Sequence, residues 1–459
     1  MRRISLILSL AATLLTTQTG HTDDLMAIYE RALRSDPSLR EAEATRSATL
    51  ESRPQARGFL LPQVGADLTY TDDQTEGSRD TTIGGQTVPS QFDNESDGWR
   101  WNIQLRQTLF RWDQWVNLKK SSKQVAQAEA DYQTANQDLM VRVARAYFDV
   151  LAAQDTLESE QAAKEAIARQ LEQANKRFEV GLIAITDVQE AQAAYDQAVA
   201  TEISSKRSLA TNKEILREIV GEFTGELAGP GEEIPLSSPD PEDEDAWVET
   251  ALRQNFFVLS SELGAQIAKD DYRVARTGHY PTVDLVASHT DTDISGLGTA
   301  SNPQTGLTTT SPIGTDSEAD SIQVQFQVPI FSGGTVSAQR REAMYRFRAA
   351  QQRFEKASRQ TEREARDAYL GVVSEISRVK ALKQARQSAR TALQATEAGF
   401  DVGTRTTVDV LDQRRQLFIA DVNYARSRYD YIINVLLLKQ AAGSLMVDDL
   451  IEVNGWLEQ

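Results

Sequence analysis

The chain of 459 residues has a formal charge of −18 and contains no cysteine. The lack of cysteine excludes a disulfide framework, a thiolate metal site and a lipidated N-terminal cysteine, and the acidic balance argues against nucleic acid as a partner. A chain of this length can hold two or three domains or one large repetitive domain.

The first 22 residues, MRRISLILSLAATLLTTQTGHT, have the features of a secretory signal peptide: a basic pair, a short apolar run and small residues near the end. We expect cleavage before Asp23, which removes two positive charges and leaves a mature chain of charge −20. No later apolar run approaches the ~20 residues that a transmembrane helix needs. An exported, cysteine-free and acidic chain is typical of the bacterial cell envelope.

The sequence matches itself at a shift of 222 residues. The shift aligns VGLIAITDVQE at residues 180–190 with VGTRTTVDVLD at residues 402–412. Self-similarity over such a distance indicates duplicated structural units. We therefore predict a first repeat at 23–222, an irregular acidic Pro- and Gly-rich linker at 223–245, a second repeat at 246–443 and a C-terminal segment at 444–459.

Each repeat is predicted to contain a helix, two strands, a very long helix and a further helix. Residues 113–180 contain neither Gly nor Pro, and their apolar and small residues recur at three- and four-residue steps, as in closely packed coiled coils. Long helices are expected at 113–180 and 335–400, and shorter ones at 187–222 and 408–442. Each long helix is then a rod of roughly 100 Å. A cytoskeletal-type coiled coil is the alternative on this feature alone.

Four runs of about ten residues alternate between apolar and polar side chains, at 62–71, 99–109, 281–290 and 321–331. This is the length of a tilted membrane-spanning β-strand, although a soluble sandwich also has one polar face. The candidates for aromatic girdles at the membrane surfaces are Trp99, Trp101, Phe110, Trp112, Trp115 and Phe331. The segments 72–98 and 291–320 are rich in Gly, Thr, Ser and Asp and are predicted to be loops.

Four strands in one chain would leave open sheet edges, which hydrocarbon does not tolerate. Several chains must therefore pool their strands. Eight strands would leave an interior filled by side chains, so a water-filled path favours three or more chains. The expected fold class is α+β: a membrane β-barrel shared between chains and continued by a long helical tube.

The chain resembles the TolC family of trimeric outer membrane efflux proteins over nearly all of the mature sequence. The segments that carry the resemblance are AYFDVLAAQDTL (146–157), KEAIARQLEQANKRFEVGLIAITDVQEA (164–191), GHYPTVDLVAS (278–288) and GFDVGTRTTVDVLD (399–412). The resemblance implies a homotrimer in the outer membrane of a Gram-negative bacterium, with a twelve-stranded barrel, four strands per protomer, above a twelve-helix periplasmic tunnel. It also implies docking to a periplasmic adaptor (a membrane fusion protein) and to an inner-membrane pump of the RND or ABC type.

Both aligned segments join a long helix to a shorter one. Gly181 and Gly403 are expected to cap the incoming helices in left-handed backbone geometry. In the first copy Thr186 or Asp187 is expected to cap or charge-stabilise the start of the next helix, and Asp409 is expected to do likewise in the second copy.

Asp409 and Asp412 lie three residues apart on one helix face. Threefold symmetry would form them into rings of six carboxylates, and crowded carboxylates would raise one another's pKa and attract cations. The resemblance assigns both positions to a cation-binding periplasmic entrance. A solvated helix face is the alternative.

The resemblance further implies that Arg405 links to Asp187 and holds the coils closed. Gln170 and Glu397 match positions that contribute an intermolecular link in the same closed state. Phe400 departs from the family example, in which a Tyr hydroxyl also reaches the Asp. We expect the closed state to rest more heavily on Arg405, and the tip to open like an iris when these links break.

No motif for catalysis or for a cofactor stands out. His21, His279 and His289 lack metal-ligand spacing, and the chain has no P-loop, no G-x-S-x-G and no Cys nucleophile. We therefore expect no enzyme activity, cofactor or metal. The expected function is a passive exit duct for drugs or secreted proteins in tripartite efflux and type I secretion. The alternative is a non-conducting structural or adhesive coiled-coil protein of the envelope.

Overall fold

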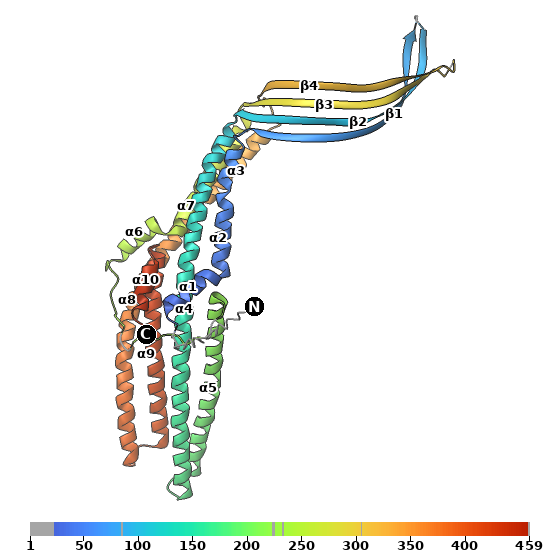
Figure 1. Ribbon diagram of the computed structural model, residues 1–459. Coiled ribbons are helices and arrows are strands. Elements are labelled where there is room, and N and C mark those ends of the chain that lie inside the picture. The colour runs from blue at the N-terminus through green and yellow to red at the C-terminus, as the bar shows by residue number, and fades with distance from the viewer. Residues whose placement is uncertain (1–22, 84–85, 223–224, 232–233, 304, 458–459) are drawn as a thin grey trace, which may run out of the picture. The chain divides into compact units, whose positions relative to one another are not determined.

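The computed structural model describes residues 23–457 except for 84–85, 223–224, 232–233 and 304 (Figure 1). The expected signal peptide, residues 1–22, lies outside the described residues. None of the described helices is long and apolar enough to cross a membrane.

The chain forms two compact units, and each unit draws on segments that are far apart in the sequence. The first comprises Met1–Ala44, Ala130–Leu259 and Lys356–Gln459, and the second comprises Thr45–Glu129 and Ser260–Glu355. Both units contain parts of both predicted repeats. The division into units therefore cuts across the repeats, because equivalent parts of the two repeats pack with each other.

Helices make up most of the chain (Figure 1). They are α1 Leu25–Ser35, α2 Pro37–Leu50, α3 Ser52–Gly58, α4 Trp112–Glu179, α5 Ile185–Val220, α6 Glu244–Gln254, α7 Phe256–Arg276, the 3-10 turn η1 Thr277–His279, α8 Thr335–Asp401, α9 Thr407–Ala441 and α10 Val447–Asn454. The long helices α4 and α8 begin and end within one residue of the predicted bounds. Helix α5 begins two residues earlier than expected.

The core of the first unit lies between α1, α4, α9 and α10. Its largest side chains are fully buried aromatics, among them Tyr29, Tyr147, Phe148 and Tyr431. The ring of Phe148 stacks on that of Tyr429 at 5.6 Å between centroids. Burial of several such side chains is worth about 1.5–3 kcal/mol each, so this cluster fixes how the helices of the unit pack.

The predicted linker is irregular, but it is anchored to this core. Leu227, Ala228 and Ile234 of the linker are buried. The Tyr147 hydroxyl donates to the Ala228 carbonyl at 2.6 Å, and the Tyr431 hydroxyl donates to the Ser237 carbonyl at 3.1 Å. Since buried hydroxyls need a partner, the aromatic core and the linker stabilise each other.

The second unit contains one antiparallel sheet with the order β1-β2-β3-β4. The strands are β1 Gln63–Ile83, β2 Gln86–Phe110, β3 Thr282–Ser301 and β4 Thr308–Gln327. They are about twice as long as predicted, and most of 72–98 and 291–320 is strand, so the loop prediction there was wrong. These polar segments have low intrinsic β-propensity. They form strands because both hairpins and the central β2–β3 pair continue in register through them, so that their backbone N–H and C=O groups are hydrogen-bonded.

The fourth predicted run also ends early. Strand β4 stops at Gln327, two residues before Pro329, whose nitrogen cannot donate to a ladder. Val328, Ile330 and Phe331 therefore lie outside the sheet, and Phe331 is 88% exposed.

One face of the sheet is apolar in the half next to the helices and acidic in the other half. In the apolar half Leu68 pairs with Trp101, and Leu285 pairs with Val324. Farther along, the same face carries the carboxylate pairs Asp72–Asp97, Asp291–Glu318 and Asp293–Asp316. The exposed apolar surface is thus a band that is bounded on one side by carboxylates and on the other by the first residues of the helices.

Candidate functional site

The candidate site is the end of the first unit where α4 turns into α5 and α8 turns into α9. Gly181 and Gly403 have φ values of 76° and 81°. After Gly181, the amide of Leu182 donates to the Arg177 carbonyl at 2.9 Å, and after Gly403 the amide of Thr404 donates to the Gly399 carbonyl at 2.8 Å. Both long helices therefore end in the same left-handed cap, which favours glycine because a side chain there is strained.

The two following helices also start alike, with one difference. In α9 the Thr406 hydroxyl accepts from the Asp409 amide at 3.2 Å, and the Asp409 carboxylate accepts from the Thr406 amide at 2.8 Å. In α5 the equivalent residue is Ala184, whose amide donates to the Asp187 carboxylate at 3.3 Å. The second copy has a full capping box, whereas the first has half of one.

The prediction that Thr186 could cap α5 was wrong. Helix α5 begins at Ile185, so Thr186 already lies within its first turn. Asp187 holds the cap from the third helical position instead. The error follows from the two-residue error in the predicted start of the helix.

The Asp-Val pair shared by the two turns joins this cap to the packing of the tip. Val188 is buried with Ala174 and Ala191, and Val410 is 2% exposed. In each turn the glycine ends one helix, the aspartate holds the start of the next, and the valine is buried. This division of roles explains why the segment is duplicated.

The two acidic side chains of the second turn are held differently. The pKa of Asp409 is lowered, first by the backbone N–H of Thr406, then by its hydroxyl, and also by the nearby Arg405. Asp412 lies one turn further into α9, where Arg415 donates to it at 3.0 Å. Within one protomer Asp409 therefore stays ionised to a lower pH than usual. This shift of the pKa is opposite in direction to the increase that is expected for crowded carboxylates.

Arg405 and Asp187 are not brought together as an ion pair among the residues that the structure describes. The Arg405 side chain lies over its own turn, and a Cβ built on Gly399 would meet its Cγ at 2.8 Å. Because Gly399 has no side chain, the Arg405 side chain can occupy the space beside it. Gln170 is 7% exposed on α4 and faces the interior of the protomer.

Glu397 has a partner within its own chain. Arg414 of α9 donates to the Glu397 carboxylate of α8 at 2.6 Å, and both side chains are half-buried. This ion pair stabilises the packing of α8 against α9, the two helices of the second hairpin. The sequence did not reveal it, because the partners lie on different helices.

The structure adds a contact between the two hairpins that the sequence did not predict. The Arg177 guanidinium lies over the Phe400 ring, 4.6 Å from its centroid. Arg177 is one of two basic residues in the last turn of α4, and Phe400 lies one residue before the end of α8. A signal was present in the sequence: the repeat shift places Arg177 on Gly399, so only one copy has this cation.

A groove runs between the first hairpin and α9. It has a volume of about 550 Å³ and is lined by α4, α5 and α9. Asp412 and Arg415 lie on one wall beside Phe418, and Glu160 and Glu190 lie on the other. The lining combines apolar side chains with these charged ones, a mixture that is typical of protein-docking surfaces.

The predicted girdle residues lie at the borders of the apolar band of the second unit. Trp99 packs against Tyr70 across β1 and β2, with ring centroids 4.8 Å apart and ring planes tilted by 49°. Trp112 and Trp115 are the first exposed aromatics of α4, and Phe110 ends β2. Such side chains suit the boundary between hydrocarbon and water. In the described part of the chain, no group of three or more His, Asp or Glu side chains is arranged to hold a metal ion.

Comparison with known families gives a match over both halves of the chain. The model of the family described as outer membrane efflux protein matches residues 28–222 and 247–444. The outer membrane protein TolC of Vibrio cholerae is 37% identical over 436 residues, which cover 95% of this chain and 94% of that protein. The alkaline protease secretion protein AprF of Pseudomonas aeruginosa is 28% identical and covers 98% of this chain and 90% of its own length.

Solved structures show the same fold. The outer membrane protein VceC of Vibrio cholerae superposes with a TM-score of 0.71 at 21% identity, covering 91% of this chain and 96% of that one. The CmeC outer membrane channel of Campylobacter jejuni superposes with a TM-score of 0.72 at 15% identity, covering 100% and 98%. At this identity the agreement concerns the fold, which is a sheet of four strands on long helical hairpins.

Proposed function

This chain belongs to the outer membrane efflux protein family, and we propose that it forms the outer-membrane exit duct of tripartite efflux and type I secretion systems. In this proposal three copies close one twelve-stranded barrel and continue it with a helical tunnel in the periplasm. The duct passively conducts drugs, secreted proteins or both, and an inner-membrane pump supplies the energy.

One observation carries the proposal: the sheet presents an exposed apolar band while both of its edge strands are unpaired. In the order β1-β2-β3-β4 the outer edges of β1 and β4 have no partner strand within the described chain. Unpaired backbone groups are not tolerated in hydrocarbon. Side-by-side pairing of β4 with β1 of the next copy removes every edge, and the polar opposite face then lines the interior.

The test of conduction is the single-channel current of the purified trimer in planar lipid bilayers. We expect discrete, long-lived open events, and a heat-resistant trimer on electrophoresis. A structural or adhesive envelope protein would give the trimer without the current. Deletion of the gene, followed by measurement of drug susceptibility and of secreted proteins, would then separate the two kinds of cargo.

The proposed gate is the end of the first unit that carries the two helix turns. Both hairpin tips are built on the same glycine cap, and in this proposal the tip opens by movement of one hairpin relative to the other. Arg177 on Phe400 joins the hairpins within a protomer, whereas Arg405 is exposed and available to Asp187 or to a neighbouring copy. Replacement of Arg405 by Ser is expected to raise the conductance, and an unchanged conductance would remove Arg405 from the gate.

We propose that the partner proteins of the duct dock at the same end of the first unit as the gate. The relative AprF is named as an alkaline protease secretion protein, which supports a secretion role beside efflux. The groove between α4, α5 and α9 is the proposed docking surface for a helical hairpin of a periplasmic adaptor. Crosslinking from a cysteine placed at Thr201, on the groove wall, tests this assignment because the chain has no other cysteine.

A further inference from the structure

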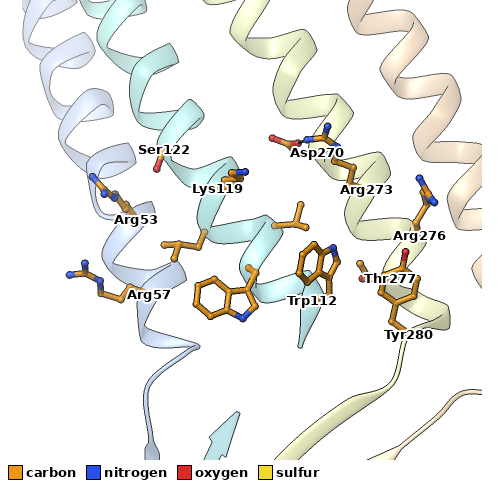
Figure 2. A pocket seen from close by; sticks show the side chains of 13 residues that line it. Arg53, Arg57, Trp112, Lys119, Ser122, Asp270, Arg273, Arg276, Thr277 and Tyr280 are labelled. Carbon is orange, nitrogen blue, oxygen red and sulfur yellow. Dashed lines mark hydrogen bonds and ion pairs between the residues drawn. The ribbon is translucent and has the colours of Figure 1, made fainter. Parts of the chain in front are cut away.

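A second cavity lies in the second unit, where the sheet meets the helices. It has a volume of about 700 Å³ and is lined by α3, α4 and the end of α7 (Figure 2). Its walls carry five cations, Arg53, Arg57, Lys119, Arg273 and Arg276, and three aromatic side chains, Trp112, Trp115 and Tyr280. Figure 2 shows the arginines of α3 on one side, those of α7 on the other, and Trp112 and Lys119 on α4 between them.

The charge of this cavity is unusual for the chain. The chain as a whole has a charge of −18, yet the cavity lining contains a single carboxylate, Asp270. Asp270 is 1% exposed and already neutralised, because Lys123 donates to it at 2.5 Å and Arg273 at 2.7 Å. The remaining cations therefore set the potential inside the cavity.

Within the described residues no ion pair involves Arg53, Arg57, Lys119 or Arg276. All four line the same cavity, so an anion bound in it would be attracted to each of them, and would reduce the repulsion between like charges. Arginine forks and a lysine ammonium are the groups that proteins use to bind phosphate oxygens.

The position of the cavity identifies the source of the anion. Trp112 follows the last residue of β2 by two positions, and Tyr280 precedes the first residue of β3 by two. The cavity therefore begins where the apolar band of the sheet ends, on the helix side. Given the proposed placement in the outer membrane, this level corresponds to the headgroups of the periplasmic leaflet.

The mixture of groups matches an amphiphile rather than a free ion. Trp112, Trp115, Val116 and Leu118 give the cavity an apolar part, while the cations form its polar part. Tryptophan and tyrosine favour the headgroup level of a bilayer, and basic pockets at that level bind anionic lipid headgroups. Free phosphate would gain nothing from the aromatic walls.

We propose that this cavity binds the phosphate headgroup of an anionic phospholipid from the periplasmic leaflet, one lipid per protomer. The cations hold the phosphate, and the aromatic side chains contact the glycerol and the first carbons of the acyl chains. Such a lipid would fix the level of the barrel in the membrane at the point where strands become helices.

The test is native mass spectrometry of the delipidated trimer with equimolar phosphatidylglycerol and phosphatidylcholine of the same acyl chains. We expect phosphatidylglycerol to bind preferentially, up to one molecule per subunit. The variant with Arg53→Gln, Arg57→Gln, Lys119→Gln and Arg276→Gln should lower that preference about tenfold or more. The matched control removes four cations of the first unit that have no ion pair among the described residues: Arg40→Gln, Arg207→Gln, Lys213→Gln and Lys380→Gln.

The control should bind lipid as the wild-type protein does. Equal binding of phosphatidylcholine, or an unchanged preference in the four-residue variant, would overturn the proposal. Displacement of the lipid by millimolar inorganic phosphate would assign the cavity to free anions instead. The single variants Arg57→Gln and Arg276→Gln serve if the fourfold variant does not give a heat-resistant trimer, and bilayer conductance, measured separately, reports on the duct itself.

Discussion

Arg177 of α4 lies over the ring of Phe400 of α8, with the guanidinium carbon 4.6 Å from the ring centroid. This contact joins the ends of the two long helices of one protomer at the proposed gate. The expectation from the resemblance was that the closed state rests more heavily on Arg405, because Phe400 lacks a hydroxyl. The structure gives the ring another role, since an aromatic face attracts a cation without any hydroxyl.

We predict that Arg177→Gln raises the single-channel conductance. An exposed cation–π contact is worth about 0.5–1 kcal/mol, so three symmetric copies would shift an open–closed balance roughly tenfold to a hundredfold. Phe400→Leu should have the same effect, and Phe400→Tyr should keep the channel closed. The control is Phe178→Leu, because Phe178 is the equivalent of Phe400 in the first repeat and no described cation lies over its ring. Identical conductance of Arg177→Gln and wild-type trimers would exclude this contact from the gate.

The sequence predicts the helices of this protein well, because long runs without Gly or Pro with a three- and four-residue period leave few alternatives. The strands were predicted at half their length. Segments such as 72–83 are polar and have poor β-propensity, so a local pattern marks them as loops. They form strands because each has a partner in register, and that information is not local.

The candidate site was predictable only where it depends on neighbouring residues in the chain. The caps at Gly181 and Gly403 and the role of Asp409 follow from spacing within a few residues. The Glu397–Arg414 ion pair and the Arg177–Phe400 contact join different helices, so local spacing does not indicate them, although the repeat alignment does single out Arg177. The basic cavity is lined by residues of separate segments, from Arg53 to Tyr280, and could not be predicted from the sequence for the same reason.

The carboxylates of the second turn give a prediction about cation block. Asp409→Asn with Asp412→Asn should abolish the block of the channel by multivalent cations, because neutral amides do not attract them. Asparagine keeps an oxygen that can accept from the Thr406 amide, so the helix start is preserved. Asp409→Ala would remove that acceptor as well, which makes the asparagine variant the cleaner test.

The pH dependence of that block follows from the direction of the shift at Asp409. Its pKa is lowered by the Thr406 bonds, so the carboxylate remains charged below the usual aspartate range. We expect block by multivalent cations to persist at pH 5 and to disappear only in stronger acid. Loss of block already at pH 5 would mean that crowding of carboxylates in the trimer outweighs the Thr406 bonds and raises the pKa.

Glu202 gives a prediction about the stability of the first hairpin. It is 6% exposed on α5 and accepts from Lys164 of α4 at 2.7 Å and from Lys206 at 2.8 Å. These bonds lower its pKa to about 2 from the ordinary value of 4.5. Its stabilising effect is therefore complete above pH 4.5 and is lost as the pH falls toward 2.

Glu202→Gln should thus lower the thermal midpoint of the hairpin at pH 7, and the difference from the wild type should shrink as the pH approaches 2. Circular dichroism at a series of pH values measures this. Glu214→Gln is the control, because Glu214 is exposed and pairs only with Arg217 of its own helix among the described residues. A difference that does not change with pH would mean that Glu202 acts through packing and not through its charge.

The unequal helix starts give a last prediction, in which each repeat is the control for the other. Thr406→Ala removes the hydroxyl that accepts from the Asp409 amide and should destabilise the start of α9 by about 1 kcal/mol. Ala184→Thr adds the equivalent hydroxyl to α5 and should stabilise that helix start by a similar amount, since Asp187 already supplies the other half of the box. Amide hydrogen exchange at residues 187 and 409 reports both changes directly. Faster exchange at 409 with no slowing at 187 would mean that the backbone of the first turn cannot place a threonine hydroxyl at the amide of Asp187, and the two turns would then be alike in sequence pattern but not in cap geometry.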